Sequence, residues 1–330
     1  MLLSYAQNLE DYVLEQVFRD VDQGAYVDVG GGHPVADNVS FWFYLKGWRG
    51  LVVEPQEKLA NAYAAIRPRD AVIAHLAGRT SGEIDFHVVE GLHGLSSANI
   101  ENAASAKQYG AAYRTIRRRV RPLSDLIDDA NLGAIRFLKI DVEGAEADVI
   151  AGLDLSRHRP EVILVEAVNP NAKDDHWKPW DATLRQGGYE FVFFDNLNRY
   201  YVAGEKRELA GRFPKAPLPW DAAAHLWDCG RAAERPDHPD RALADALVAG
   251  LMANLTRLPP DVLTELLASG LEASARNAGS GAAGLAGTAE WPRRDAAAQP
   301  ADLGAFLTSD RGRAALGRIA CMYDGGHLLE

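Results

Sequence analysis

The chain has 330 residues, of which 35 are Lys or Arg and 46 are Asp or Glu, so its formal net charge is −11 at pH 7. This balance disfavours a nucleic-acid partner, because phosphate binding requires a clustered positive surface. Its two cysteines form neither a disulfide framework nor a metal-binding spacing. The length is sufficient for one α/β domain of about 200 to 250 residues and an appendage.

The N-terminal residues predict neither a signal peptide nor a membrane anchor. Acidic residues interrupt the apolar pattern of residues 1–18, and the chain contains no run of about 18 apolar residues. We therefore expect a cytoplasmic protein with no transmembrane segment. Residues 4–19 have the spacing of an amphipathic covering helix, whose polar run, including Gln7, could also roof the cofactor end of a sheet.

Residues 25–55 have the pattern of one βαβ unit of a parallel sheet. A short β-rich run at 26–29 leads into three glycines, and residues 35–46 have an approximately helical apolar spacing. A second apolar strand at 51–53 ends in Glu54. Because glycine lacks a Cβ atom, three glycines at a strand end leave room for a ligand.

The residues around the glycines favour one class of nucleotide. An acid at the tip of the second strand accepts hydrogen bonds from ribose hydroxyls, and Glu54 follows Gly30 at close to the expected spacing of about 20 residues. A dinucleotide fingerprint requires a small residue where Val35 stands, and Asp28 would repel a pyrophosphate. Asp28 instead suits the sulfonium end of S-adenosylmethionine. The cofactor candidates are Asp28, Gly30, Gly31, Gly32, Asn38, Glu54, Pro55, Ala77 and Gln7.

The next elements are predicted from periodicity. A helix is predicted over 57–66, and a third strand begins at 71–74 and finishes at Ala77. In nucleotide-binding sheets the edge of the adenine lies at this point, so we expect Ala77 beside it. Residues 83–89 alternate in the manner of an antiparallel accessory strand. The mixed segment 101–120 predicts a helix with a mobile loop.

Two polar segments remain open in their role. In the loop 91–97, the side chains of His93, Ser96 and Ser97 are candidates for substrate contacts, although a solvated turn explains His93 alone. The basic run 114–121 is either a solvated face or a local patch for an anionic substrate.

A second concentration of chemistry follows a buried strand at 135–140. Asp141, Glu143 and Glu146 come within six residues, and the next buried strand ends at Glu166. Glu143 and Glu146 can be explained by the first turn of a helix, where acids are favoured by about 0.3 to 1 kcal/mol. Asp141 belongs at a strand tip beside the glycine turn, where open α/β sheets bind ligands.

The chain from about Ser4 to Asp221 resembles the FkbM family of S-adenosylmethionine-dependent O-methyltransferases. The matching stretches are SYAQNLED, YVDVGGGHP, GWRGLVVEP, GLSS, FLKIDVEGAE, VILVEA and FFDNLNRYYVA. The resemblance implies a Rossmann-like, seven-stranded methyltransferase sheet closed by an antiparallel hairpin over 191–202. It also implies methyl transfer to a hydroxyl, often of a sugar in a surface polysaccharide or glycosylated metabolite. Pro34 stands where the family usually has a small residue. We expect this departure to mark the subtype of the family that is associated with polysaccharides.

Residues 222–330 lie outside the resemblance and differ in composition. Helices are predicted over 241–257, 261–276 and 302–319, with a Gly/Ala-rich linker near 277–300. We therefore expect a methyltransferase domain at 1–221 and a C-terminal helical extension at 222–330. The extension is predicted to mediate homo-oligomerisation or partner docking, and a substrate lid is the rival interpretation.

Methyl transfer to an alcohol requires that the hydroxyl proton be removed. Asp141 or Glu143, with Glu166 nearby, is the direct candidate for the base, and His33 or His93 is the indirect one. Alternatively, Asp141, Glu143 and Glu166 hold Mg²⁺, which would acidify the hydroxyl.

Two other classes of function remain open. The chain could be an NAD-dependent oxidoreductase, or a non-catalytic binding or scaffold protein with a vestigial site.

Overall fold

The computed structural model describes residues 3–89, 92–168, 177–254, 257–259, 262, 266 and 308–324. The chain divides into two compact units, the first spanning residues 3–223 and the second beginning at Ala224. Within the described segments, no helix is long and apolar enough to cross a bilayer.

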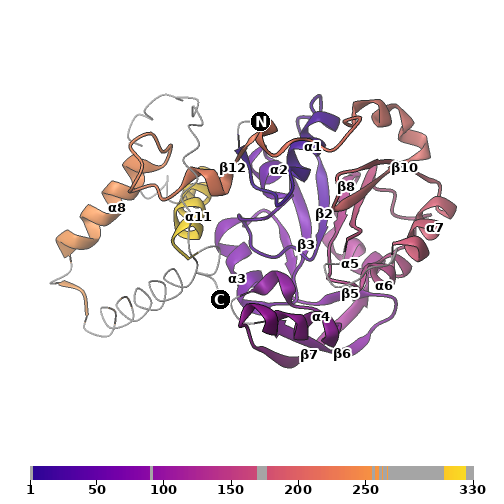
Figure 1. Ribbon diagram of the computed structural model, residues 1–330, viewed down its shortest axis with the longest axis horizontal. Coiled ribbons are helices and arrows are strands. Elements are labelled where there is room, and N and C mark those ends of the chain that lie inside the picture. Colours follow the sequence, from indigo (N-terminus) through magenta and orange to yellow (C-terminus); the bar gives the residue numbers. More distant parts are fainter. Residues whose placement is uncertain are drawn as a thin grey trace. The chain divides into compact units, whose positions relative to one another are not determined.

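In its described residues, the first unit contains a seven-stranded sheet with the strand order β10-β11-β9-β8-β2-β3-β4 (Figure 1). The strands from β9 to β4 are parallel to one another, and β11 is antiparallel to both of its neighbours. This confirms the predicted Rossmann-like sheet with an antiparallel closing hairpin. The strands are β2 (Ala25–Val29), β3 (Arg49–Val53), β4 (Ala71–Ile73), β8 (Ile135–Ile140), β9 (Val162–Glu166), β10 (Tyr189–Phe194) and β11 (Asn198–Ala203).

Helices cover both faces of this sheet, which explains why its central strands are apolar on both sides. Val27 and Leu138 face a core that includes apolar residues of α5, α6 and α7. On the opposite face, Phe137 packs against Phe43 of α2, with ring centroids 4.9 Å apart. The helices are α1 (Glu10–Val17), α2 (Phe41–Leu45), α3 (Glu57–Ile66), α5 (Leu123–Ala130), α6 (Glu146–Ala151) and α7 (Lys178–Gln186).

A second, three-stranded sheet has the order β5-β7-β6 in the described part of the first unit. The antiparallel accessory strand predicted at 83–89 is confirmed as β6, which pairs with β7. The elements of this part of the chain are β5 (Leu76–Gly78), β6 (Gly82–Val89), the 3₁₀ turn η1 (His93–Leu95), α4 (Ile100–Ser105), the 3₁₀ turn η2 (Ala106–Tyr109) and β7 (Tyr113–Pro122).

Two of the predicted elements are wrong in this region. The segment 101–120 was expected to be a helix with a loop, but its second half is strand β7, which buries Val120 and exposes Arg117 and Arg119. This period of two marks a half-buried strand. The predicted third strand is also divided: β4 ends at Ile73, and Ala77 lies in β5, where it pairs with β7.

The predicted N-terminal helices are shorter in the structure. Residues 4–19 form a helix only at α1, and residues 35–46 only at α2. The remaining elements of the first unit are β1 (Leu3–Ser4) and the 3₁₀ segments η3 (Gly204–Arg212) and η4 (Trp220–Ala222).

The second unit is mainly helical in its described residues. Its elements are β12 (Ala224–His225), η5 (Leu226–Cys229), α8 (Arg241–Asn254) and α11 (Asp310–Asp324). The guanidinium of Arg318 in α11 donates two hydrogen bonds of 2.8 Å to the carboxylate of Asp240. The predicted linker at 277–300 lies outside the described residues, as does the predicted helix at 261–276 apart from residues 262 and 266.

A fully buried arginine lies beneath the turn that follows β2. Arg67 forms an ion pair with Asp70 at 2.7 Å, and both side chains have 0% exposure. Its guanidinium also donates to Asn38 Oδ1 at 2.9 Å, Ser40 Oγ at 2.8 Å and the hydroxyl of Tyr26 at 2.9 Å. These bonds connect β2, α3 and the segment before α2 through one cation, and they hold residues 38–40 outside the helix.

Replacing this arginine should destabilise the first unit strongly. Arg67→Met is expected to lower the free energy of unfolding by about 3–5 kcal/mol, because it leaves the buried carboxylate of Asp70 without its cation. Urea denaturation measures this loss. Arg117→Met is the matched control, since Arg117 and Asp85 form an exposed pair at 3.2 Å that should contribute less than about 1 kcal/mol. Equal losses in the two variants would contradict the role given to Arg67.

Candidate active site

The glycine turn after β2 is packed directly against the loop after β8. Gly30 has φ +77°, and a Cβ atom added there would lie 1.7 Å from the carbonyl oxygen of Asp141. A Cβ added to Gly31 would lie 2.4 Å from Cγ1 of Val52. The turn therefore requires glycine at both positions, and it brings the ends of two adjacent strands together.

Glu54 lies where the sequence predicts it, at the end of β3 beside the glycine turn. One carboxylate oxygen accepts a hydrogen bond from Gly32 N and the other from Gln56 N, each at 2.8 Å. Each oxygen has a second lone pair, so the carboxylate can also accept bonds from ligand hydroxyls. The neighbouring carbonyl of Pro55 accepts from Arg118 Nε at 2.8 Å, which ties this corner to β7.

Asp28 and Asn38 lie beneath the turn and support it. The Asp28 side chain has 0% exposure and accepts a hydrogen bond of 2.6 Å from Ser40 Oγ. Asn38 is also buried, and its Nδ2 donates to Gly31 O at 2.9 Å and to the hydroxyl of Tyr63 at 2.8 Å. Asn38 thus supports the backbone of the turn, whereas Asp28 contacts the side chains of Ser40 and Lys139, and the direct cofactor contacts predicted for these two residues stay predictions.

The other candidates outside the carboxylates are dispersed. His33 Nδ1 accepts hydrogen bonds from Val35 N and Ala36 N, so its lone pair shapes the turn and is not available to take a proton as the predicted indirect base would. Gln7 is exposed in the segment before α1, and the side chain of His93 lies outside the described residues. Ala77 lies in the second sheet and does not continue the third strand as predicted, and its placement beside an adenine stays a prediction.

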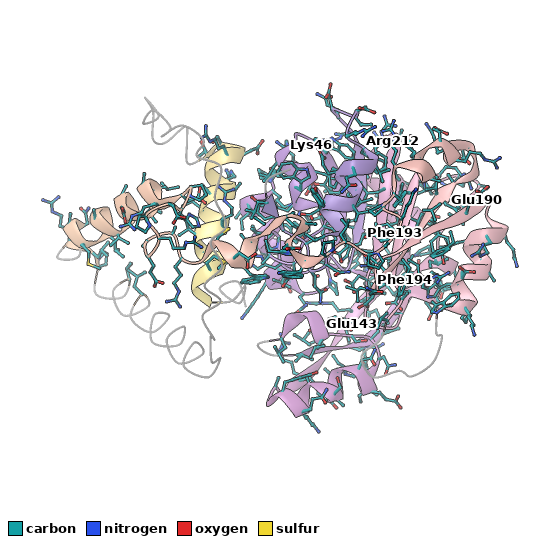
Figure 2. The ribbon with its side chains drawn as sticks, turned by 45° about the horizontal axis from the view of Figure 1, so that its top comes forward. Lys46, Glu143, Glu190, Phe193, Phe194 and Arg212 are labelled. Atoms are coloured by element: carbon teal, nitrogen blue, oxygen red, sulfur yellow. The ribbon has the colours of Figure 1, made fainter. Side chains whose placement is uncertain are left out.

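Three carboxylates converge at the adjoining strand ends. Asp141 follows β8, Glu166 ends the neighbouring strand β9, and each can offer an oxygen that lies within 4.8 Å of one from Glu143. Glu143, labelled in Figure 2, reaches this cluster from a backbone with φ 55°. The sequence predicted these three residues as one site, and the structure brings them together.

The crowding of the acids raises the affinity of Glu143 and Glu166 for protons. Burial, together with the nearby charges of Asp141 and Glu146, raises the pKa of Glu143 to about 8. Burial and the charge of Asp141 raise the pKa of Glu166 further still, and a hydrogen bond to Asp141 adds to the effect. The pKa of Glu143 is therefore closer to neutrality than that of Glu166, as general-base catalysis requires.

Lys139 is a site residue that the sequence motifs did not predict. Its buried Nζ lies 3.1 Å from Asp141 Oδ2 and 3.8 Å from Asp28 Oδ1, and it donates to Gly30 O at 3.2 Å. Burial lowers the pKa of Lys139, but the charges of Asp141 and Asp28 outweigh this and raise it above its ordinary value. The ammonium thus joins the glycine turn to the side chains of Asp28 and Asp141. A lysine inside the apolar run FLKI is the signal that could have revealed it.

The GLSS segment contacts the carboxylate loop, residues 141–145. Ser97 Oγ donates to Glu143 O at 2.8 Å, and Asn102 Nδ2 donates to the same carbonyl. Ser96 Oγ accepts from Val89 N at 3.0 Å. Ser96 and Ser97 thus form bonds within the protein, and their predicted substrate contacts stay predictions.

The segment before α1 lies over the same edge of the sheet. Asn8 Nδ2 donates to Asp195 O at 3.1 Å, and Glu10 Oε1 accepts from Asn198 Nδ2 at 2.9 Å. Burial and the charge of Asp195 raise the pKa of Glu10 to about 8. The N-terminal segment therefore meets the turn of the closing hairpin, so SYAQNLED and FFDNLNRYY contact each other in the fold.

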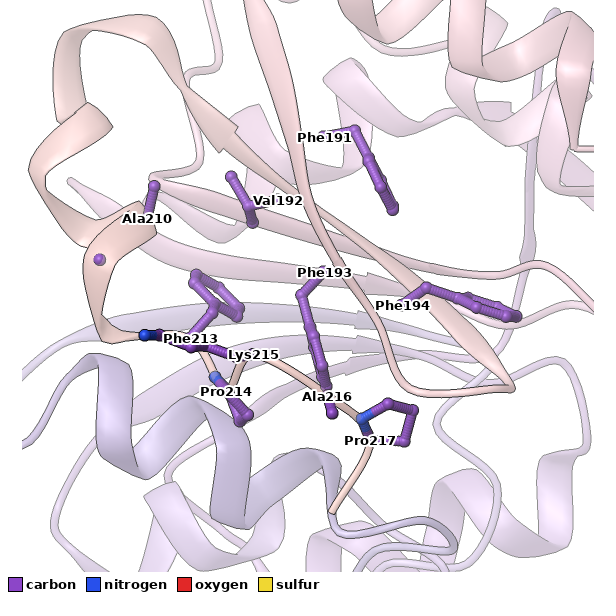
Figure 3. A pocket seen from close by; sticks show the side chains of 11 residues that line it. Phe191, Val192, Phe193, Phe194, Ala210, Phe213, Pro214, Lys215, Ala216 and Pro217 are labelled. Carbon is purple, nitrogen blue, oxygen red and sulfur yellow. The ribbon is translucent and has the colours of Figure 1, made fainter.

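A pocket of about 530 Å³ opens along β10, the end strand of the large sheet (Figure 3). Phe193 and Phe213 contribute aromatic side chains to its lining, and residues 214–217 form the opposite side. β11 lies between β10 and β9 in the sheet, and no member of the carboxylate cluster lines the pocket. The pocket is therefore separate from the candidate active site.

The glycine turn can be tested by adding a single methyl group. Gly30→Ala places a Cβ atom 1.7 Å from Asp141 O, so the backbone must move. Gly47→Ala is the matched control, because Gly47 has φ +95° and nothing lies within 4 Å of an added Cβ. Both variants incur the left-handed penalty of about 1–2 kcal/mol, and Gly30→Ala should cost at least about 2 kcal/mol more. Urea denaturation compares them, and equal losses would refute the close contact.

A family model described as the methyltransferase FkbM domain matches residues 23–191, just over half of the chain. Among solved structures, the chain is similar to methyltransferase FkbM from Methylobacillus flagellatus KT, with 17% sequence identity and a TM-score of 0.34. The similarity covers 58% of this chain and 50% of that one, so the chain matches about half the length of that protein. No curated protein matches the chain. The family match includes the glycine turn, Glu54 and the three carboxylates, and the chain belongs to the FkbM methyltransferase domain family.

Proposed function

We propose that this protein transfers a methyl group from S-adenosylmethionine to a hydroxyl group, in a sugar of a surface polysaccharide or glycosylated metabolite. The methyltransferase part of this proposal is supported by the family match over residues 23–191. The observation that carries it further is the contact between Gly30 and Asp141, which joins a ligand cradle to a cluster of carboxylates.

The residues of the site fit the chemistry of this cofactor. In the proposal, the turn at residues 30–32 receives the amino-acid end and Glu54 binds the ribose, in agreement with its position at the tip of β3. The neighbouring carboxylates favour a cation. When bound, S-adenosylmethionine supplies an electrophilic methyl group attached to a sulfonium. A pyrophosphate fits less well, because the buried carboxylate of Asp28 and the partly exposed carboxylate of Asp141 lie beside the turn.

The chain's own task is to bind the acceptor, exclude water and take its proton. Glu143 is the proposed general base, because its pKa of about 8 suits proton transfer near neutral pH. Asp141 lies 3.1 Å from the ammonium of Lys139 and is proposed to stabilise positive charge nearby. Glu166, whose pKa is raised further, supplies a hydrogen bond to Asp141.

The same three carboxylates could hold Mg²⁺ in place of a proton. Oxygen ligands suit this ion, and their convergence within 4.8 Å is the observation in favour. Against it, the ammonium of Lys139 already lies 3.1 Å from Asp141. We therefore favour the carboxylate base.

Chelation distinguishes the two arrangements. After treatment with EDTA, methyl transfer from S-adenosylmethionine carrying a labelled methyl group is expected to continue, whereas Glu143→Gln should lower it by about 10²-fold or more. In this assay, nucleotide sugars and simple glycosides are supplied as the methyl acceptors. Loss of transfer on chelation, restored by Mg²⁺ alone, would establish the metal arrangement.

The second unit has a proposed docking role that is separate from catalysis. Helix α8 exposes apolar side chains that include Leu247, Leu251 and Met252. Such a face supports the prediction of homo-oligomerisation or partner docking through the C-terminal helices. A cytoplasmic location likewise stays a prediction.

Glu54 provides the direct test of cofactor binding. Glu54→Ala is expected to abolish the binding of S-adenosylmethionine measured by calorimetry, because the ribose loses its acceptor. Glu57→Ala is the control, since Glu57 lies three residues further on and its side chain is 71% exposed. Circular dichroism checks that both variants are folded. Unchanged affinity in folded Glu54→Ala would remove Glu54 from the site.

A thermal-shift panel separates the three classes of function. We expect S-adenosylmethionine and S-adenosylhomocysteine to raise the melting temperature and NAD or NADP to leave it unchanged, each with and without Mg²⁺. A shift with NAD alone would indicate an oxidoreductase. No shift with any ligand would indicate a binding or scaffold protein with a vestigial site.

A further inference from the structure

Glu143 adopts a backbone conformation that its residue type disfavours. It has φ 55°, in the left-handed region, and it is followed by Gly144 at φ 100°. A non-glycine residue in this region carries a cost of about 1–3 kcal/mol and persists only where its surroundings impose it. The surroundings of Glu143 must therefore impose this conformation.

Two buried side chains converge on the carbonyl of this residue. Ser97 has 0% exposure and Asn102 has 7%, and both donate hydrogen bonds to Glu143 O. Ser97 is fixed in turn by two backbone hydrogen bonds with His87 in β6. Asn102 lies in α4. Ser97, which is paired with the second sheet, and Asn102 of α4 thus both bind the same oxygen atom of the carboxylate loop.

The opposite side of the loop is held by the chain itself. Glu146 Oε1 accepts hydrogen bonds from Val142 N at 3.2 Å and Gly144 N at 3.0 Å. The carbonyl of Glu143 and the backbone amides of Val142 and Gly144 are all hydrogen-bonded, so the peptide units around Glu143 have one orientation. That orientation directs the Glu143 carboxylate toward Asp141 and Glu166.

We infer that Ser97 and Asn102 are positioning residues that hold Glu143 in the carboxylate cluster and thereby set the preference of the site for the cationic methyl donor over its neutral product. The inference rests on the proposed function, since it takes the cluster to face the donor. It gives the GLSS segment a task in the site without any contact between that segment and the substrate.

The link between position and preference is electrostatic. S-adenosylmethionine has a sulfonium charge that S-adenosylhomocysteine lacks, and a cluster of carboxylates held beside the donor attracts that charge. The attraction falls with distance and with access of water. A Glu143 carboxylate released from its position would weaken the binding of the donor and leave that of the product nearly unchanged.

Calorimetry with both ligands tests this preference without an acceptor. We expect the ratio of the two dissociation constants to shift against S-adenosylmethionine by about tenfold in the double variant Ser97→Ala/Asn102→Ala, and similarly in Glu143→Gln. Ser96→Ala is the matched control, because this adjacent buried serine binds Val89 N and should leave the ratio unchanged. An unchanged ratio in the double variant, or equal weakening of both ligands, would overturn the inference.

A thermal cycle in the absence of ligand tests the positioning by itself. Glu143→Gly removes the left-handed penalty and should raise the melting temperature by about 2–4 °C. Removing Ser97 and Asn102 should then cost more in the Glu143→Gly background than in the natural chain, because only the natural chain is relieved of backbone strain when residue 143 is released. Equal costs in the two backgrounds would overturn the positioning role. Failure of the natural chain to bind either ligand would refute the proposed function and leave this cycle as the test of the positioning.

Discussion

The active-site end of the large sheet depends on one close approach between two backbones. A side chain of any size on Gly30 would meet the carbonyl of Asp141, so the turn after β2 and the loop after β8 can touch only through glycine. In the proposed function, this contact joins the binding site of the cofactor to the carboxylates that take part in the reaction. Arg67 stabilises the turn from below, where its guanidinium holds Asn38 and Ser40 in position.

The charges above and below the turn form one connected system. Lys139 lies between Asp28 and Asp141, and Glu143 and Glu166 crowd around Asp141 from the adjoining loop and strand. A single buried ammonium leaves this group of carboxylates with excess negative charge. Such a group lowers its energy by holding protons or by binding a cation. The proposed methyl donor is a cation, and the proposed reaction releases a proton, so both parts of the chemistry draw on the same excess.

Much of this arrangement could be predicted from local patterns, because each strand end is followed immediately by its functional residue. Glu54 and Glu166 were predicted on this basis. Long-range partners leave no such mark: no local pattern identifies Arg67 as a buried cation, and the bonds from Ser97 and Asn102 to Glu143 depend on a separate sheet. Strand β7 was mistaken for a helix with a loop because its arginines obscured an alternation in which only one face is buried.

We propose that the glycine turn and the carboxylate cluster form one site for a positively charged methyl donor. A crystal structure of the protein grown with S-adenosylmethionine tests this proposal. We expect electron density for the ribose against Glu54 and for the sulfonium between the glycine turn and Asp141. Density for the donor elsewhere on the protein, with the turn left empty, would contradict it.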